Sequence, residues 1–352
     1  MRFLPTEEQR DFARSLDAML TAADTPTAVR AWAAGDATPG RALWSRLAEA
    51  GVFALAVPEP YEGVGPLPVE LATAFVELGR QAAPGPLVES VAAAALLTEL
   101  AASGETGPAK RLLPGLTSGA TVATLTMPTG PAPARATPAG AVPTGLVPTL
   151  ALDPDVADVI LVVRGDELWM APGHEGVRVS ADPARRLARP SPGGELLAAG
   201  SAVREAAAHA RHWAVLATAA QALGVGLTLL DRTVAYAKQR RQFGTEIGSF
   251  QAVKHRLADT LIALEFARPL LFGAAVTFRS TDLAAAKVAA GEAAYTAART
   301  ALQIHGAVGY TEELDLSLWL RKARPLRDAW GTPSWCRAEV MRTYDEVYDT
   351  GS

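Results

Sequence analysis

Apolar residues recur at helical spacing through both ends of this chain, with shorter alternating runs between them. The first helix is expected to begin at Thr6, a typical N-cap residue that is followed by acidic residues. Phe12 and Leu16 then continue the helical period. We therefore predict an N-terminal helical domain over residues 1–118. The same period returns in residues 43–55, 69–78 and 92–102.

The middle of the chain changes to short runs rich in valine, isoleucine and leucine, separated by proline and glycine. Such runs are typical of strands that are joined by turns. We therefore predict a small β-barrel over residues 119–204. The runs that carry this prediction are residues 122–125, 156–163, 168–170 and 177–179.

Long helical periods return after residue 204 and continue to the end of the chain. Long helices with short links are typical of a bundle, so we predict a C-terminal four-helix bundle over residues 205–352. Together with the first two regions, this gives an α+β fold that is mainly α. The helices are expected at residues 209–237, 251–272, 283–304 and 316–348, the last with breaks at Pro325 and Pro333.

Composition narrows the classes of function. Hydrophobic residues make up 49% of the 352 residues and charged residues 20%, so the chain can bury a sizeable core. A net charge of −4 gives no electrostatic reason to expect a nucleic acid or an anionic membrane as partner. The sequence has a single cysteine, Cys336, which excludes an internal disulfide framework and fits a reducing compartment. No apolar run approaches the roughly 20 residues of a membrane span, and the N-terminus lacks the apolar core of a signal peptide. We therefore expect a cytoplasmic protein.

Two stretches carry the candidate chemistry, and in each a helix runs into glycine. Residues 236–244 read Tyr-Ala-Lys-Gln-Arg-Arg-Gln-Phe-Gly, and residues 303–310 read Gln-Ile-His-Gly-Ala-Val-Gly-Tyr. Exposed backbone N–H groups and a fixed guanidinium can meet phosphate oxygens at such breaks. The two stretches resemble the acyl-CoA dehydrogenase family, whose patterns are Tyr-Ala-x-x-Arg-x-Gln-Phe-Gly and Gln-x-x-Gly-Gly-x-Gly-Tyr. Residues 57–65, 77–80 and 257–259 resemble further family segments.

The resemblance covers nearly the whole chain and implies an FAD enzyme that oxidises acyl-CoA thioesters to their 2,3-enoyl forms. Arg240 matches the arginine that contacts the flavin pyrophosphate, a role that suits a permanently charged fork of donors. In the family these groups serve the FAD of a neighbouring subunit, across a dimer interface. No metal ligand is assigned. The remaining candidate cofactor contacts are Gln242, Phe243, Gln303, Gly306 and Thr332, near the adenosine half, and Thr126 near the flavin ring.

The sequence departs from the family pattern around the expected flavin seat. Thr126-Met-Pro stands where the family has Thr-Glu-Pro, and residues 131–133 replace its Gly-Ser-Asp. The family's Trp-Ile-Thr segment has no counterpart before Asp155, and residues 128–148 suggest a shortened binding loop. Ala307 replaces a glycine of the second motif, and His305 is expected to be a packed helix-end residue rather than a base. We therefore expect a barrel without its flavin seat.

The catalytic base of the family has no equivalent in this sequence. The glutamate that removes the α-proton falls on Trp330, whose indole offers a donor and no basic lone pair. Some members place the glutamate on the long helix before the first motif, which here falls at or near Ala214. Asp328 lies two residues from Trp330, an offset that points it elsewhere on a helix.

Three hypotheses follow from these residues. The first is a subunit resembling the smaller, base-less partner in heteromeric (α2β2) steroid-CoA dehydrogenases of actinobacteria, which lends half of an FAD site to a partner carrying the glutamate. The second is an autonomous homotetrameric enzyme with a displaced base, acting on acyl-CoA or an acyl-carrier-protein thioester. The third is a non-catalytic acyl-CoA-binding scaffold. Loss of both bases disfavours the second, and the retained flavin motifs disfavour the third. An electron acceptor is implied by the first two.

Overall fold

The first helix begins where the sequence predicts. The computed structural model describes residues 5–128 and 150–349, and α1 (Glu7–Ala22) starts directly after Thr6. The Thr6 hydroxyl accepts a hydrogen bond from the Gln9 backbone N–H, while the Gln9 side chain accepts one from the Thr6 backbone. This reciprocal pair satisfies two N–H groups that a helix start would otherwise leave unpaired.

Further helices follow before the first strand. Two of them were not predicted: α2 (Thr25–Ala33) and α6 (Thr106–Thr117). Proline lowers helix propensity in general, so these segments did not look helical in the sequence. Each contains proline in its first turn, where the missing N–H breaks no hydrogen bond of the helix. The predicted helix over residues 43–55 ends earlier, because Gly51 adopts a left-handed conformation with φ of 77°. The other elements are α3 (Thr38–Glu49), η1 (Val52–Ala54), η2 (Glu59–Tyr61), α4 (Pro68–Arg80) and α5 (Leu87–Ala102).

The chain divides into two compact units that do not follow its order. One contains residues 1–43, 67–84 and 215–352, and the other contains residues 44–66 and 85–214. The predicted division into three consecutive domains stays a prediction.

The second unit holds two β-sheets. A four-stranded sheet has the order β1-β3-β4-β7, with β1 and β3 parallel and the other pairs antiparallel. A three-stranded antiparallel sheet has the order β2-β6-β5. The strands β2, β6 and β7 were not predicted. The bounds are β1 (Ala123–Thr126), β2 (Ala151–Leu152), β3 (Val159–Arg164), β4 (Glu167–Ala171), β5 (His174–Val179), β6 (Arg186–Pro190) and β7 (Glu195–Ala199).

A small apolar cluster lies between strands of these sheets. Ala151, Ile160, Val162 and Ala171 are buried together, with Trp169 packed against them. Alternate residues of a strand point to opposite faces, so Ile160 and Val162 contribute from one face of β3. The expected shortened binding loop and the replacement at residues 131–133 lie outside the described residues.

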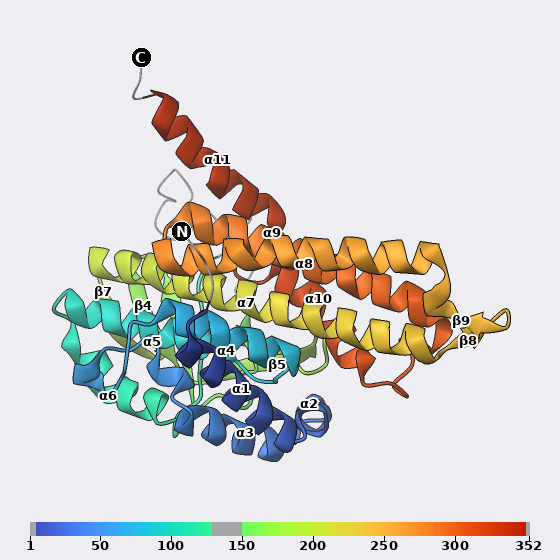
Figure 1. The fold of residues 1–352 in the computed structure, drawn as a ribbon. Helices are drawn as coiled ribbons and strands as arrows, with labels where there is room; N and C mark the ends of the chain where they lie inside the picture. Colours follow the sequence, from blue (N-terminus) through green and yellow to red (C-terminus); the bar gives the residue numbers. More distant parts are fainter. Residues whose placement is uncertain (1–4, 129–149, 350–352) are drawn as a thin grey trace. The chain divides into compact units, whose positions relative to one another are not determined.

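Long helices dominate the first unit (Figure 1). Three of them extend beyond their predicted ranges, and the fourth predicted helix, over residues 316–348, is broken after Asp328 rather than at Pro325. A short hairpin, β8 (Arg241–Gln242) and β9 (Thr245–Glu246), projects from one end of these helices. The helices are α7 (Ser201–Gln239), whose first residues belong to the second unit, α8 (Gln251–Thr277), α9 (Ser280–His305), α10 (Leu316–Asp328) and α11 (Pro333–Asp349), with η3 (Ile247–Ser249) and η4 (Gly306–Tyr310).

Glycine allows α4 and α7 to touch backbone to backbone. A Cβ atom on Gly79 would lie 2.1 Å from the Gln221 carbonyl oxygen, and one on Gly224 would lie 2.0 Å from the Val76 carbonyl oxygen. The carbonyl of Arg80, next in the chain, accepts hydrogen bonds from Thr228 and from the Trp319 indole. The residue 77–80 segment thus fixes helix packing in this unit.

Two helices, α7 and α8, are long and apolar enough to cross a membrane by length and composition. Their surroundings differ. The most apolar window of α7 is 94% buried inside the protein, whereas that of α8 is only 33% buried. The apolar surface of α7 therefore belongs to the protein core, whereas most of that of α8 is left uncovered by the residues that the structure describes.

Candidate functional site

The first motif forms the end of α7 and a tight hairpin. The Arg240 N–H donates to the Tyr236 carbonyl at 2.9 Å, and the Arg240 carbonyl accepts from the Ile247 N–H at 2.8 Å. The turn at Phe243 and Gly244 has φ values of 51° and 79°. Two consecutive positive φ angles are typical of a two-residue turn whose twist matches the strands, and Gly244 adopts such an angle without strain. The hairpin therefore holds Arg240 and Gln242 beside the helix end.

The second motif ends α9 in a similar way. Gly306 caps the helix with φ of 65°, and its N–H donates to the Leu302 carbonyl. The chain then turns through η4. Gln303 is exposed in the last turn of the helix, and Ala307, which replaces the family's glycine, is exposed just beyond it.

The two motifs line one pocket of about 590 Å³. The structure thus brings together four of the predicted cofactor contacts, Arg240, Gln242, Gln303 and Gly306. Two residues outside the motifs, Ile247 and Leu314, also line this pocket. The rest of its lining comes from motif residues that were not assigned as cofactor contacts, namely Tyr236, Ile304, His305, Ala307 and Val308.

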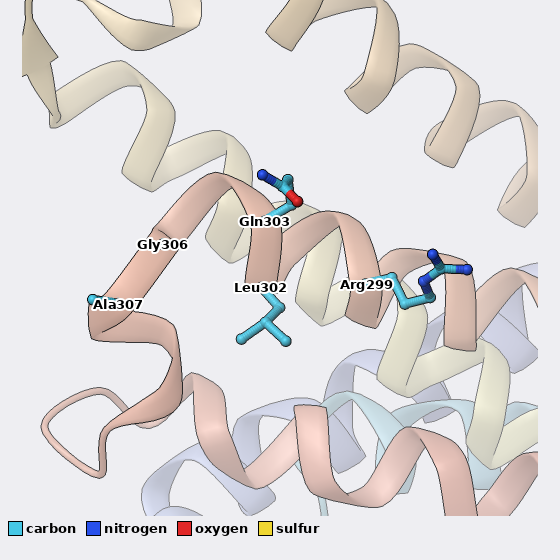
Figure 2. A pocket seen from close by; sticks show the side chains of 5 residues that line it. All are labelled: Arg299, Leu302, Gln303, Gly306 and Ala307. Atoms are coloured by element: carbon cyan, nitrogen blue, oxygen red, sulfur yellow. The ribbon is translucent and has the colours of Figure 1, made fainter.

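Two smaller pockets continue along α9 from Gln303. One is lined by Arg299, Leu302, Gln303, Gly306 and Ala307, and Figure 2 shows Arg299 and Gln303 about one turn apart on the helix. The other, between α8 and α9, adds Arg256. Sequence reasoning missed both arginines. Neither lies in a motif. Arg299 is four residues before Gln303 on α9, whereas Arg256 comes beside Gln303 only through the packing of α8 on α9.

The remaining candidate contacts lie elsewhere. Thr332 caps the start of α11, where its hydroxyl accepts a hydrogen bond from the Trp335 N–H at 3.3 Å, and it does not line the 590 Å³ pocket. Thr126 belongs to β1 of the second unit and is 5% exposed. Phe243, at the hairpin tip, is 90% exposed and touches only the edge of Phe250 among the ring contacts of the described chain.

Trp330 lies in the turn between α10 and α11. It is 9% exposed and has a φ of 56°. The buried ammonium of Lys287 on α9 holds this turn, because it donates to the carbonyls of Leu326 and Arg327 at 2.9 Å and of Gly331 at 3.3 Å. A cation at the last carbonyls of a helix also complements the helix dipole.

The positions that might have replaced the missing base offer no free carboxylate. Ala214 is fully buried in α7 and carries a methyl group. Asp328 is exposed at the end of α10, where its carboxylate lies 3.7 Å from the Arg327 guanidinium. An exposed carboxylate that faces an arginine is not held against a buried substrate carbon.

Comparison with known proteins decides the family. Residues 6–120 match the acyl-CoA dehydrogenase N-terminal domain, and residues 201–344 match the acyl-CoA dehydrogenase C-terminal domain. The chain belongs to the acyl-CoA dehydrogenase family. The predicted fold class, a mainly helical α+β architecture of this family, is confirmed.

Several acyl-CoA dehydrogenases are similar over the whole chain. An acyl-CoA dehydrogenase called IpdE2 from Mycobacterium tuberculosis is 31% identical over 350 residues, covering 98% of this chain and 99% of the relative. The ChsE4–ChsE5 complex, also from Mycobacterium tuberculosis, contains a chain with 25% identity and a TM-score of 0.75, with 99% of each chain covered. A glutaryl-coenzyme A dehydrogenase structure, with 21% identity and a TM-score of 0.77, shares the fold over 97% of this chain and 96% of its own.

Acyl-CoA dehydrogenases are oxidoreductases that act on CH–CH bonds with FAD as cofactor, and this chain is one of them. The pocket at the two motifs fits half of that cofactor. The Arg240 guanidinium is exposed and makes no ion pair among the described residues, so its donors are available to a diphosphate. The Gln303 amide supplies both donor and acceptor for a nucleoside.

Proposed function

We propose that this acyl-CoA dehydrogenase chain is a subunit without a catalytic base, which lends half of an FAD site to a homologous partner. The partner carries the catalytic glutamate and the pocket for the flavin ring. The substrate is an acyl-CoA thioester, and we propose the CoA ester of a steroid side chain. Support for the substrate is the sequence resemblance and the similarity in fold to a structure described as a steroid acyl-CoA dehydrogenase, which has 24% identity and a TM-score of 0.78.

The observation that carries this proposal is the open pocket at the ends of α7 and α9. It gathers Arg240, Gln242 and Gln303 without any carboxylate among its lining residues. A pocket with an unpaired guanidinium and no acidic group suits an anion such as a diphosphate. In this arrangement Arg240 would hold the diphosphate of FAD and Gln303 its adenosine half. The cofactor would supply the acceptor for the hydride that leaves the β-carbon of the thioester.

Phe243 supports the idea of a ligand that arrives from another chain. A phenylalanine with positive φ is a backbone outlier, and such outliers cluster at binding sites. Its ring is 90% exposed, and its ring contact among the described residues is the one with Phe250. Against the cofactor or a partner surface, the ring would lose that exposure to water.

The uncovered face of α8 supports a protein partner. Leu261, Ile262, Phe266 and Leu270 are 45%, 52%, 71% and 46% exposed, at helical spacing that places them along one side. The charges on this stretch, Glu265 and Arg268, pair with each other. Monomers rarely expose a contiguous apolar surface of this kind, so we propose that the homologous subunit covers it.

Trp330 and Ala214 support the proposal that the partner subunit supplies the catalytic base. The chain's own residues provide no carboxylate at either place where the family keeps its base, so the α-proton must go to a group on the partner. The alternative is an autonomous enzyme in which Asp328 acts as the base. The exposed position of Asp328 beside Arg327 disfavours this alternative.

Co-expression tests the proposal. The chain purified alone should lack the visible flavin spectrum, and the chain purified with an acyl-CoA dehydrogenase partner should carry it.

Arg240→Ala should weaken FAD binding by the assembled complex about tenfold to a hundredfold, because one charge-assisted contact is removed. Arg324→Ala, an exposed arginine of α10 outside the pocket, is the matched control and should leave affinity unchanged. Full flavin occupancy of the isolated chain, unaffected by Arg240→Ala, would show that the pocket is not the flavin site.

A further inference from the structure

One aromatic contact joins the two motifs. The rings of Tyr236 on α7 and His305 on α9 stack, with centroids 4.1 Å apart and planes 24° apart. Tyr236 lies one turn before Arg240, whose N–H donates to the Tyr236 carbonyl at 2.9 Å. His305 lies two residues after Gln303. The stack therefore connects the helix end that carries the guanidinium with the helix end that carries the amide.

His305 is held firmly within this contact. Its side chain is 6% exposed, and its Nδ1 lies 2.8 Å from the Ala301 carbonyl oxygen. A carbonyl only accepts, so Nδ1 carries the hydrogen. Burial lowers the pKa of His305, although the bond to Ala301 acts in the opposite direction, and the ring is therefore neutral at pH 7. The expectation that His305 is a packed residue is confirmed.

Glycine at position 309 makes room for the base of the His305 side chain. A Cβ atom added to Gly309 would lie 3.1 Å from the His305 Cβ and 3.3 Å from the Leu302 Cδ1. Contacts of that length are tighter than ordinary van der Waals distances, so a side chain there would press on His305. The turn after α9 is thus built closely around the histidine.

We propose that Tyr236 and His305 are positioning residues that set the spacing between Arg240 and Gln303 across the pocket. This inference rests on the proposed function, in which the pocket takes the adenosine diphosphate half of FAD. A diphosphate and its nucleoside are covalently joined at fixed lengths, so the guanidinium and the amide serve them together only at a matching separation. Both residues line the pocket, and they act through the helix ends that bear the two polar groups.

The test uses the full-length chain and ADP as probe, titrated by calorimetry. His305→Ala and Tyr236→Ala should each weaken ADP binding about threefold to tenfold, the range for losing an aromatic pair. His305→Phe and Tyr236→Phe keep two stacked rings and should bind ADP within about twofold of wild type. The double variant Tyr236→Ala with His305→Ala should lose no more than the worse single variant, because both changes remove one contact. Wild-type affinity in both alanine variants would overturn the inference.

A stability control separates positioning from folding. Leu271→Ala removes a fully buried side chain of α8 that lies outside the pocket, so it should lower the unfolding midpoint and leave ADP affinity unchanged. An equal loss of ADP affinity in Leu271→Ala would also overturn the inference. Arg240→Ala identifies the cause of a negative result. If it too has no effect, or if wild type binds no ADP, the proposed half-site is wrong; if it alone weakens binding, only the positioning role is wrong.

Discussion

Three described aromatic residues, Phe243, Phe278 and Trp330, hold left-handed backbone conformations, and the surroundings of Phe243 and Trp330 are opposite. Phe243 is 90% exposed at a hairpin tip, whereas Trp330 is 9% exposed in the turn before α11. A bulky side chain with positive φ costs conformational energy, which the surrounding structure must offset. For Trp330, buried packing and the bonds from Lys287 hold the turn. For Phe243 the described chain offers little, which agrees with a contact that forms only on assembly.

The first prediction concerns Trp330→Glu. Restoring a carboxylate at this position should not give the isolated chain steady turnover, because the Thr126-Met-Pro segment still departs from the family's flavin contact. Introducing a charge at a 9% exposed position should also lower the free energy of unfolding by about 3–5 kcal/mol. The measurement is turnover of acyl-CoA and steroid-CoA thioesters with FAD and an artificial electron acceptor, with Trp330→Phe as the control. Steady turnover by the isolated wild-type chain would contradict our interpretation of Trp330.

At the scale of elements, apolar periodicity predicted most of the helices, and proline misled the prediction of where α10 ends. The helix α8 runs through the exposed Pro269, as predicted. The helix α10 runs three residues past Pro325, where a break was predicted, and the Pro325 carbonyl accepts from the Ala329 N–H. Proline removes a donor but keeps its acceptor, so a helix can continue when neighbouring contacts compensate.

The candidate site was also predicted only in part from the sequence. The two motifs predicted that Arg240, Gln242, Gln303 and Gly306 act together, and the structure places them around one pocket. Arg299 lies four residues before Gln303 on α9, so helical periodicity could have placed the two together. Arg256 could not be found in this way, because its approach to Gln303 depends on how α8 packs on α9. Such packing distances arise from the whole unit and leave no local signal in the sequence.

Lys287 gives a prediction about how α10 ends. Lys287→Met keeps the length of the side chain but leaves the carbonyls of Leu326, Arg327 and Gly331 without this donor. The free energy of unfolding should fall by about 2–4 kcal/mol, measured by chemical denaturation. Lys254→Met, at an exposed position of α8, should change it by less than about 0.5 kcal/mol. Equal stability of the two variants would show that the three bonds do not stabilise the turn.

Glu77 on α4 gives a prediction about pH. Burial raises its pKa to about 7, against the opposing charge of Arg80. The folded chain therefore holds this proton to a higher pH than the unfolded chain, so stability is lost as pH rises from about 4.5 through 7. Glu77→Gln has no such proton. The free energy of unfolding of Glu77→Gln minus that of wild type should therefore rise by roughly 2–3 kcal/mol when the pH is raised from 5 to 8. A difference that stays constant over this range would exclude a raised pKa at Glu77.

At the scale of the whole molecule, the two long apolar helices divide their roles. The core of the first unit is built on α7, while α8 leaves a row of apolar side chains in water. The proposed partner would bury that row, and burying apolar surface is the main source of affinity between subunits.

Phe266→Lys tests that role. Phe266 is 71% exposed, so the change should leave the fold of the isolated chain intact and weaken its association with the partner subunit at least about tenfold. Size-exclusion chromatography with light scattering measures the assembly. Met341→Lys, at a 56% exposed position of α11, is the matched control and should assemble normally. Normal assembly of the Phe266 variant would place the partner on another face.

The buried ammonium of Lys287 also makes this protein a reporter of its own unfolding. Lys110, Lys238 and Lys254 are exposed and should react readily with an amine-selective acylating reagent, whereas Lys287 and Lys322 are 1% and 2% exposed. A donor committed to three carbonyls has no lone pair or free access to offer an electrophile. Mass spectrometry of the peptide that contains Lys287 should therefore find acylation only in molecules whose α10 has come away from α9. Such labelling would count opening events in a cell extract without any engineered probe.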